Sequence, residues 1–266
     1  MTLKADSIAV GFDKVTVLNN ASLELSAAQI IAIGGPNGVG KSTLIKTMAR
    51  QLKPISGTVT VNGADIWSVS PSEFARQLAY VPQNFDGNLE LTVEEMVSLG
   101  RNPHQQWWQW QSSSHDREAV EKALAASGLS KLKSKSLSQL SGGEKQRAAV
   151  ATALAQEPKY LLLDEPTANL DFKHQLDLLA MLRELREQGL GIMLVLHDLN
   201  MMAKVADRVI LLERVSEDSA GQIAVDGTAE STLTQENLRR IFEIDVHPFK
   251  DPNTGETYFN PFVGAG

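Results

Sequence analysis

The chain has 266 residues, a formal net charge of −7 and no cysteine. The length fits one α/β domain with an inserted lobe, and a 42% share of hydrophobic residues can form a core without disulfides or metals. Nucleic-acid binders usually carry a basic stripe, which this acidic sequence lacks, so we expect no nucleic-acid partner. The lack of cysteine excludes disulfides and thiolate chemistry.

The apolar runs of the sequence are short, and the longest are Tyr160–Leu163 and Ile192–Leu196. A membrane-spanning helix needs roughly 20 apolar residues. The first six residues lack the apolar stretch of a secretory signal. We therefore expect a chain that does not cross a membrane by itself.

The first part of the chain predicts antiparallel strands followed by a strand, a turn and a helix. Residues Ile8–Leu25 alternate loosely in hydrophobicity and predict antiparallel strands. A short buried strand is predicted over Gln29–Gly34 and a helix with one apolar face over Lys41–Leu52. Another strand is predicted over Gly57–Gly63, where an Asn-Gly turn ends it.

Helical spacing replaces this pattern between about residues 88 and 158. Three segments there predict helices: Val93–Leu99, Arg117–Ser127 and Gly143–Gln156. Strands and helices then alternate along the chain. We expect strands at Tyr160–Leu163, Ile192–Leu196 and Arg208–Glu213, and helices at Phe172–Gln188 and Asn200–Val205. Unbroken apolar strands separated by helices predict a parallel sheet covered on both faces.

The C-terminal tail, residues 216–266, predicts a hairpin around Gly221 and a helix over Gln235–Phe242. Its proline-rich end, with Pro248, Pro252 and Pro261, predicts irregular structure. A tail of roughly fifty residues is short for an independent domain, so we expect it to pack on the core. We thus expect one domain over 1–266, with a core of 1–87 and 159–215 and a helical subdomain of about 88–158.

A P-loop pattern follows the first buried strand and precedes a helix, as this motif requires. The residues of the pattern are Gly35, Pro36, Asn37, Gly38, Val39, Gly40, Lys41, Ser42 and Thr43. Glycines let backbone N–H groups turn toward phosphate oxygens, and the helix N-terminus adds its positive dipole end. Lys41 would reach the β- and γ-phosphates of ATP, and the Ser42 hydroxyl would bind Mg²⁺.

Polar residues also follow two later strands, at the edge of a parallel sheet where ligands bind. Asp164 and Glu165 follow the strand that ends at Leu163. Beside a P-loop, Asp164 would hold Mg²⁺ and Glu165 would act as general base on the attacking water. His197 follows the strand that ends at Leu196 and could sense the γ-phosphate, although a lone histidine is more often a structural residue.

The segment Leu140–Glu144, Leu-Ser-Gly-Gly-Glu, opens a predicted helix and forms a second potential anion site. It resembles the signature of ATP-binding cassette (ABC) ATPases, and the resemblance spans nearly the whole chain. It implies a P-loop NTPase core with a mainly parallel sheet, an N-terminal antiparallel β lobe and an inserted α-helical subdomain. It also implies a homodimer in which each ATP lies between one P-loop and the partner's signature.

The resemblance assigns further residues to this paired site. The signature residues Ser141, Gly142, Gly143 and Glu144 would bind the partner's ATP. Gln83 matches the Q-loop, which contacts Mg²⁺, takes part in catalysis and links to the transmembrane partner. Ala168–Asp171 matches the D-loop, with Asp171 at the dimer seam. Phe12 falls where the family stacks a Tyr on adenine; the alternative is a core aromatic.

A narrower resemblance rests on Leu91–Val93, Leu99–His104, His197–Asn200 and Val246–Pro248. These segments are similar to ATPase subunits of importers for ferric siderophores, haem and vitamin B12. The resemblance implies a peripheral protein at the cytoplasmic face of the inner membrane, bound to integral-membrane permease subunits. A periplasmic or surface substrate-binding protein would act indirectly, and we favour ferric siderophore or ferric citrate as the cargo. The Trp107–Trp110 stretch fits a surface loop better than a permease contact.

Three other functions remain open from the sequence. A non-transport ABC ATPase would act on the ribosome or DNA, but such proteins usually carry two cassettes or long coiled coils. A small-molecule kinase would use the P-loop and leave the signature without a role. An exporter cassette is usually fused to membrane helices.

Overall fold

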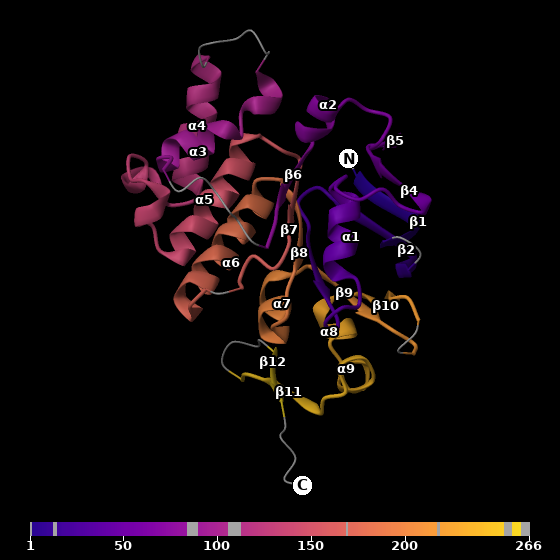
Figure 1. Ribbon diagram of the computed structural model, residues 1–266. Helices are drawn as coiled ribbons and strands as arrows, with labels where there is room; N and C mark the ends of the chain where they lie inside the picture. The colour runs from indigo at the N-terminus through magenta and orange to yellow at the C-terminus, as the bar shows by residue number, and fades with distance from the viewer. Residues whose placement is uncertain are drawn as a thin grey trace.

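The computed structural model describes residues 2–12, 15–83, 90–105, 113–168, 170–216, 219–252 and 257–261. A six-stranded sheet with the order β10-β9-β3-β8-β7-β6 forms its centre, and a four-stranded sheet with the order β2-β1-β4-β5 lies to one side (Figure 1). Helix α1 contacts both sheets, whereas α5, α6 and α7 lie on the other side of the central sheet. In the described part of the chain, no helix is long and apolar enough to cross a membrane.

The antiparallel sheet contains β1 (Thr2–Phe12), β2 (Val15–Ser26), β4 (Ser56–Val61) and β5 (Ala64–Asp65). The predicted antiparallel arrangement is confirmed, but β1 begins at Thr2 rather than Ile8. The pairing of β1 with β2 shifts register between Ala5 and Ile8, and Ser7 there has a φ of 49°. This irregularity breaks the alternation of apolar residues, so the first half of β1 did not show in the pattern.

The central sheet contains β3 (Ile30–Gly34), β6 (Leu78–Val81), β7 (Tyr160–Leu163), β8 (Gly191–Val195) and β9 (Arg208–Glu213). Its neighbouring pairs β9–β3, β3–β8, β8–β7 and β7–β6 are all parallel, which confirms the predicted sheet. Strand β10 (Gln222–Gly227) pairs antiparallel with β9 and forms the predicted hairpin around Gly221. The sequence pattern did not reveal β6, because its four residues adjoin a short helix without a clear boundary.

Among the described residues, apolar side chains form two clusters, one on each face of the central sheet. The first lies beneath α1 (Lys41–Met48) and the antiparallel sheet. Helix α1 ends before the predicted Leu52, since Arg50 adopts a left-handed conformation with a φ of 60°. The second cluster lies beneath α6 (Phe172–Glu187) and α7 (Leu199–Val205).

The second cluster continues into the predicted helical region. This region contains α3 (Val93–Leu99), α4 (Ser114–Ala126) and α5 (Gly142–Ala155), which contact one another. Short 3-10 turns connect them at Asn102–His104, Ser130–Leu132 and Leu137–Gln139. Helix α2 (Pro71–Ala75) lies between β5 and β6 in the chain and contacts the first of these turns. The three predicted helices are confirmed: α3 has the predicted bounds, whereas the ends of α4 and α5 shift by one to three residues.

The C-terminal tail contains α8 (Ala229–Thr232), α9 (Gln235–Phe242), β11 (Val246–Lys250) and β12 (Thr257–Pro261). The prediction of an irregular end is wrong, because β11 and β12 pair antiparallel. A two-stranded ribbon tolerates proline, since each strand has an unpaired edge. Val246 and Phe259 are buried in the second apolar cluster, which confirms that the tail packs on the core.

Candidate nucleotide-binding site

The three chemically suggestive segments of the sequence meet at one edge of the central sheet. Strand β8 lies between β3 and β7, and all three strands run parallel. The P-loop pattern follows β3, Asp164 follows β7, and His197 lies just beyond β8. The sheet therefore brings the predicted phosphate, metal and catalytic residues to a common edge.

The P-loop turns sharply from β3 into α1, and its glycines permit that turn. Gly35 has a φ of 143° and Gly40 a φ of 113°, and a Cβ atom on Gly35 would lie 2.6 Å from the carbonyl oxygen of Leu212. Both positions favour glycine for these reasons. Pro36, Asn37 and Gly38 form the tip of the loop, where Asn37 and Gly38 are exposed.

The side chain of Lys41 folds back into the loop. Its Nζ donates hydrogen bonds of 2.9 Å to the carbonyl oxygens of Gly35 and Pro36, and the residue is only 5% exposed. Burial lowers the pKa of Lys41, while the nearby charges of Glu165 and Asp164 act to raise it. The loop thus holds a cation beside the N-terminus of α1, where Ser42 and Thr43 occupy the first turn.

Ser42 and Asp164 form a pair of oxygen groups next to the lysine. Ser42 Oγ donates a 2.8 Å hydrogen bond to Asp164 Oδ1, and the hydroxyl of Tyr80 donates a longer one, of 3.4 Å, to Oδ2. Asp164 is 2% exposed, and burial raises its pKa against the hydrogen bond from Ser42. The sequence pattern did not single out Tyr80, although it lies two residues before Pro82 in the Q-loop segment.

Glu165 is held by both of the other candidate catalytic residues. Gln83 Nε2 donates a 2.6 Å hydrogen bond to Glu165 Oε2, and His197 Nε2 lies 2.7 Å from Oε1. Glu165 also has a φ of 49°, in the left-handed region that non-glycine residues rarely adopt. Three residues that sequence analysis placed in one catalytic group are therefore in direct contact.

The signature residues form a separate group at the start of α5. Ser141 caps the helix: its Oγ accepts a hydrogen bond from the N–H of Glu144, whose carboxylate accepts one from the N–H of Ser141. Gly142 is exposed, whereas Gly143 is buried against the ring of His174. The P-loop precedes α1, and this helix lies on the opposite side of the central sheet from α5 (Figure 1).

Asp171 caps the N-terminus of α6, where its carboxylate accepts a 2.9 Å hydrogen bond from the N–H of His174. Phe12 ends β1 and is 52% exposed, so the alternative of a core aromatic is wrong. Two predictions fall outside the described residues: the role of the Trp107–Trp110 stretch, and Asn169 of the D-loop segment.

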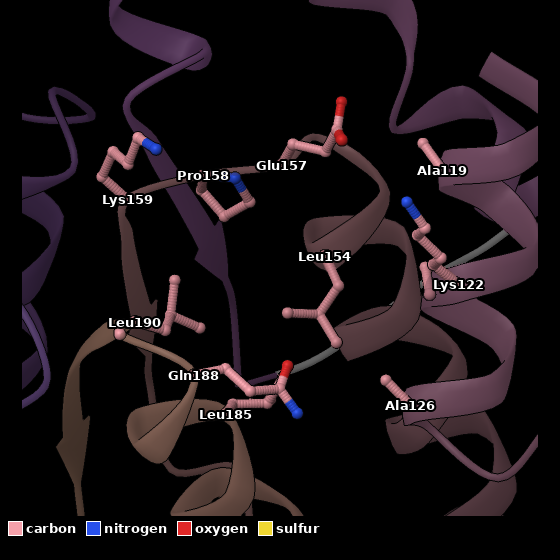
Figure 2. Close-up of a pocket in the computed structure, with 12 residues that line it drawn as sticks. Ala119, Lys122, Ala126, Leu154, Glu157, Pro158, Lys159, Leu185, Gln188 and Leu190 are labelled. Atoms are coloured by element: carbon pink, nitrogen blue, oxygen red, sulfur yellow. The ribbon is translucent and has the colours of Figure 1, made fainter. Parts of the chain in front are cut away.

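A pocket of about 280 Å³ lies at the opposite end of the sheet (Figure 2). Its lining includes Lys159 and Leu190, which precede β7 and β8, and Leu154 and Leu185 from α5 and α6. The candidate site follows the other ends of these strands, so this pocket is distinct from it.

The sequence of this chain matches a known protein family over most of the segments that form the site. A family model described as ABC transporter matches residues 18–168, which include the P-loop, the signature and Asp164 with Glu165. The chain belongs to the ABC transporter family. It is therefore an ABC-type ATPase coupled to transport, and a kinase that uses only the P-loop is set aside.

Curated relatives of this ABC ATPase include three import or transport proteins. The ferric enterobactin transport ATP-binding protein FepC of Escherichia coli is 39% identical, covering 95% of this chain and 91% of the relative. The petrobactin import ATP-binding protein FpuC of Bacillus anthracis is 38% identical, covering 92% and 87%. The hemin import ATP-binding protein HmuV of Bordetella avium is 35% identical, covering 97% and 98%.

Solved structures give the same fold. An inward-facing ABC transporter assigned to the metal-chelate type matches with a TM-score of 0.84 and 26% identity, covering 99% of this chain and 98% of that chain. A nucleotide-free cassette of an ABC transporter matches with a TM-score of 0.76 and 25% identity, covering 95% and 97%. The α/β cassette fold with its antiparallel sheet and helical region is therefore shared over nearly the whole chain.

Proposed function

We propose that this ABC ATPase drives an importer for ferric siderophores or a related iron chelate, haem or vitamin B12. The names of the relatives support this proposal, since they describe transport of ferric enterobactin, petrobactin and hemin. Two copies would bind integral-membrane permease subunits at the cytoplasmic face of the inner membrane. A periplasmic or surface substrate-binding protein would deliver the cargo to the permease.

Within the nucleotide site, each group has a role that its chemistry supports. Lys41 and the backbone N–H groups of Asn37–Thr43 would bind the β- and γ-phosphates, because they combine a buried cation with a helix N-terminus. Phe12, exposed at the end of β1, would stack on adenine.

The same site offers oxygen donors that fit Mg²⁺. Ser42 Oγ and Asp164 Oδ1 lie 2.8 Å apart, and hydroxyl and carboxylate oxygens are the hard ligands that this ion prefers. Gln83, with its side-chain amide, would complete the protein ligands. When bound, Mg²⁺ neutralises charge on the β- and γ-phosphate oxygens.

Glu165 is the group best placed to activate water for hydrolysis. Its carboxylate would accept a proton from water as the water oxygen bonds to the γ-phosphorus and the bond from that phosphorus to ADP breaks. The contacts from Gln83 and His197 fix the carboxylate in one orientation. His197 would also contact the γ-phosphate and detect its presence.

The signature would complete the partner's site rather than its own. Ser141, Gly142, Gly143 and Glu144 would bind the partner's ATP, because they open α5 as a second anion site. Asp171 would lie at the seam between the two copies. A homodimer with two ATP molecules would close on binding and open after hydrolysis.

The single observation that carries the catalytic proposal is the contact of Gln83 and His197 with the one carboxylate of Glu165. Glu165→Gln keeps the shape of the side chain but removes its basicity. The variant should lose hydrolysis, retain MgATP and form a stable dimer in size-exclusion chromatography with light scattering. A variant that stays monomeric in saturating MgATP contradicts the paired site. Glu187→Gln, an exposed change at the end of α6, is the matched control.

Transport is tested separately. Permease chains should copurify with the ATPase in detergent, whereas copurified ribosomes or DNA would support the non-transport alternative. In vesicles that contain the assembled transporter, a binding protein loaded with ferric siderophore should stimulate ATP hydrolysis. The same assay with ferric citrate, haem and vitamin B12 shows which cargo stimulates ATP hydrolysis.

A further inference from the structure

His174 lies in the first turn of α6 and contacts both the N-cap residue of that helix and the first turn of α5. Its ring Nδ1 lies 2.8 Å from Asp171 Oδ1, the same oxygen that accepts the hydrogen bond from its backbone N–H. Another part of the ring packs on α5: a Cβ atom on Gly143 would lie 2.7 Å from His174 Cγ and Cδ2. His174 therefore joins the cap of α6 to the first turn of α5.

The start of α6 does not require this ring. The backbone N–H of any non-proline residue at position 174 can donate to the Asp171 cap. The ring Nδ1 adds a second contact to the same oxygen, and the ring edge fills the space that a side chain at position 143 would take. The imidazole thus adds two contacts that the backbone cap lacks: a second contact to Asp171 and one to α5.

The side chains of Asp171 and His174 differ in their exposure to solvent, and this difference indicates their roles. The Asp171 side chain is 67% exposed, whereas that of His174 is 27% exposed. Hydrogen bonds from the His174 N–H and then from its ring lower the pKa of Asp171, so this carboxylate stays ionised. Asp171 is therefore accessible to a second protein chain, while His174 holds it from the inner side.

We propose that His174 is a positioning residue that links the signature turn to Asp171, so that both meet a second copy of this chain as one unit. The inference rests on the proposed head-to-tail dimer, in which the signature binds the partner's ATP and Asp171 lies at the seam. A phosphate that displaces the first turn of α5 also displaces the ring on Gly143 and, through Nδ1, the carboxylate of Asp171. Packed side chains and hydrogen bonds carry coupling of this kind.

Three substitutions separate the two contacts. His174→Phe keeps a flat ring against Gly143 but cannot contact Asp171 through a ring nitrogen. His174→Asn keeps a short hydrogen-bonding group near Asp171 but removes the ring. His174→Ala removes both contacts and should lower kcat roughly tenfold, in the range expected for coupling between sites. The Phe and Asn variants should fall between His174→Ala and the parent.

The decisive measurement is cooperativity rather than activity alone. The affinity of the isolated chain for ATP should stay within about twofold of the parent, because the P-loop is untouched, while the Hill coefficient for ATP hydrolysis falls toward one. His115→Ala is the matched control: His115 also lies in a first helical turn and pairs with a carboxylate, at 3.1 Å from Glu157 Oε2. This control should leave both kcat and the Hill coefficient unchanged.

We would measure dimerisation in MgATP for Glu165→Gln alone and for Glu165→Gln combined with His174→Ala. The first result tests the proposed function, and the difference between the two tests the role of His174. If Glu165→Gln dimerises and the added His174→Ala weakens its dimer at least fivefold, the positioning role holds. If the dimer and the Hill coefficient are unchanged while only the melting temperature falls, His174 is a structural residue and the inference is overturned. If Glu165→Gln itself stays monomeric, the paired site fails and the inference fails with it. If His174→Ala does not fold, the same dimerisation measurement is made with His174→Phe and His174→Asn in its place.

Discussion

His197 Nε2 lies 2.7 Å from Glu165 Oε1, while Gln83 Nε2 donates to Oε2 of the same carboxylate at 2.6 Å. Two segments that are distant in sequence from Glu165 therefore hold its side chain. The left-handed backbone of Glu165, with a φ of 49°, is a conformation that surrounding contacts must maintain. The carboxylate is thus oriented by the protein itself, which is the arrangement that a general base requires.

Removing the imidazole should impair hydrolysis more than binding. We expect His197→Ala to lower kcat by about 10², the lower end of what an acid–base group contributes, because Glu165 remains as the base and loses one of the two side-chain contacts seen among the described residues. The KM for ATP should change little, because the P-loop contacts remain. Phosphate release at saturating MgATP measures the effect. A kcat within threefold of the parent would show that the contact between His197 and Glu165 is only structural.

The ionised carboxylate of Asp164 should lower the stability of the ligand-free protein. Burial raises its pKa, so the folded state binds a proton more readily than the unfolded state does. Stability is then lost as pH rises from the unfolded pKa of about 3.9 through the folded pKa, and the loss is complete at higher pH. Asp164→Asn removes this penalty and should raise the Tm at pH 7 but not near pH 3.

The same variant tests the metal role. Asp164→Asn should abolish the additional rise in Tm that Mg²⁺ gives to the ATP-bound parent, since a carboxylate ligand is lost. Thermal unfolding with ATP, with and without Mg²⁺, measures this difference. Asp177→Asn, an exposed change on α6, should retain the full Mg²⁺ effect. Equal Mg²⁺ effects in both variants would exclude Asp164 as a ligand.

Local motifs made most of the site predictable from sequence. The P-loop, the signature and the pair Asp164–Glu165 each lie in a continuous run, so their residue types and spacing are visible without a fold. The parallel sheet was predictable because unbroken apolar strands alternate with helices. Parallel strands that end at one edge then brought His197 to the same place as the P-loop.

Tyr80 and His174, which no sequence pattern singles out, act through contacts between distant segments. Tyr80 reaches Asp164 only because β6 pairs with β7, and His174 reaches Gly143 only because α6 packs on α5. Neither contact leaves a spacing pattern. The terminal hairpin was missed for a different reason: prolines predict irregular structure unless the strand edges are known to be free.

Arg101 and Asp116 form a buried pair that should stabilise the helical region. Arg101 is 1% exposed; its Nε donates to Asp116 Oδ1 at 2.8 Å and its Nη1 to the carbonyl oxygen of Ala155 at 2.6 Å. Burial alone would raise the pKa of Asp116, but hydrogen bonds from Arg101 and Ser113 lower it to about 2. The pair thus braces the start of α4 against the end of α5.

The depressed pKa fixes the pH window of this contribution. Stabilisation by Asp116 is fully present above the unfolded pKa of about 3.9 and is lost as pH falls toward 2. Asp116→Asn should therefore lower the free energy of unfolding at pH 7 by an amount on the order of 2 kcal/mol. Urea unfolding between pH 7 and pH 3 should show the difference shrinking at the acid end. A difference that stays constant with pH contradicts the ionic origin, and Glu118→Gln on the exposed face of α4 is the control.

Gly143 and His174 should be energetically coupled, because their contact leaves no room for a Cβ atom. Gly143→Ala must displace the ring of His174, so this substitution should lower the free energy of unfolding by about 1–3 kcal/mol, as overpacking does. His174→Ala removes the ring, and the double variant should then recover a large part of that loss. A double-mutant cycle by urea unfolding should give a coupling energy of at least about 0.5 kcal/mol. Gly142→Ala, where a Cβ atom would meet nothing within 4 Å, should show no coupling to His174→Ala. Additive effects of Gly143→Ala and His174→Ala would mean that the ring does not bear on the signature turn.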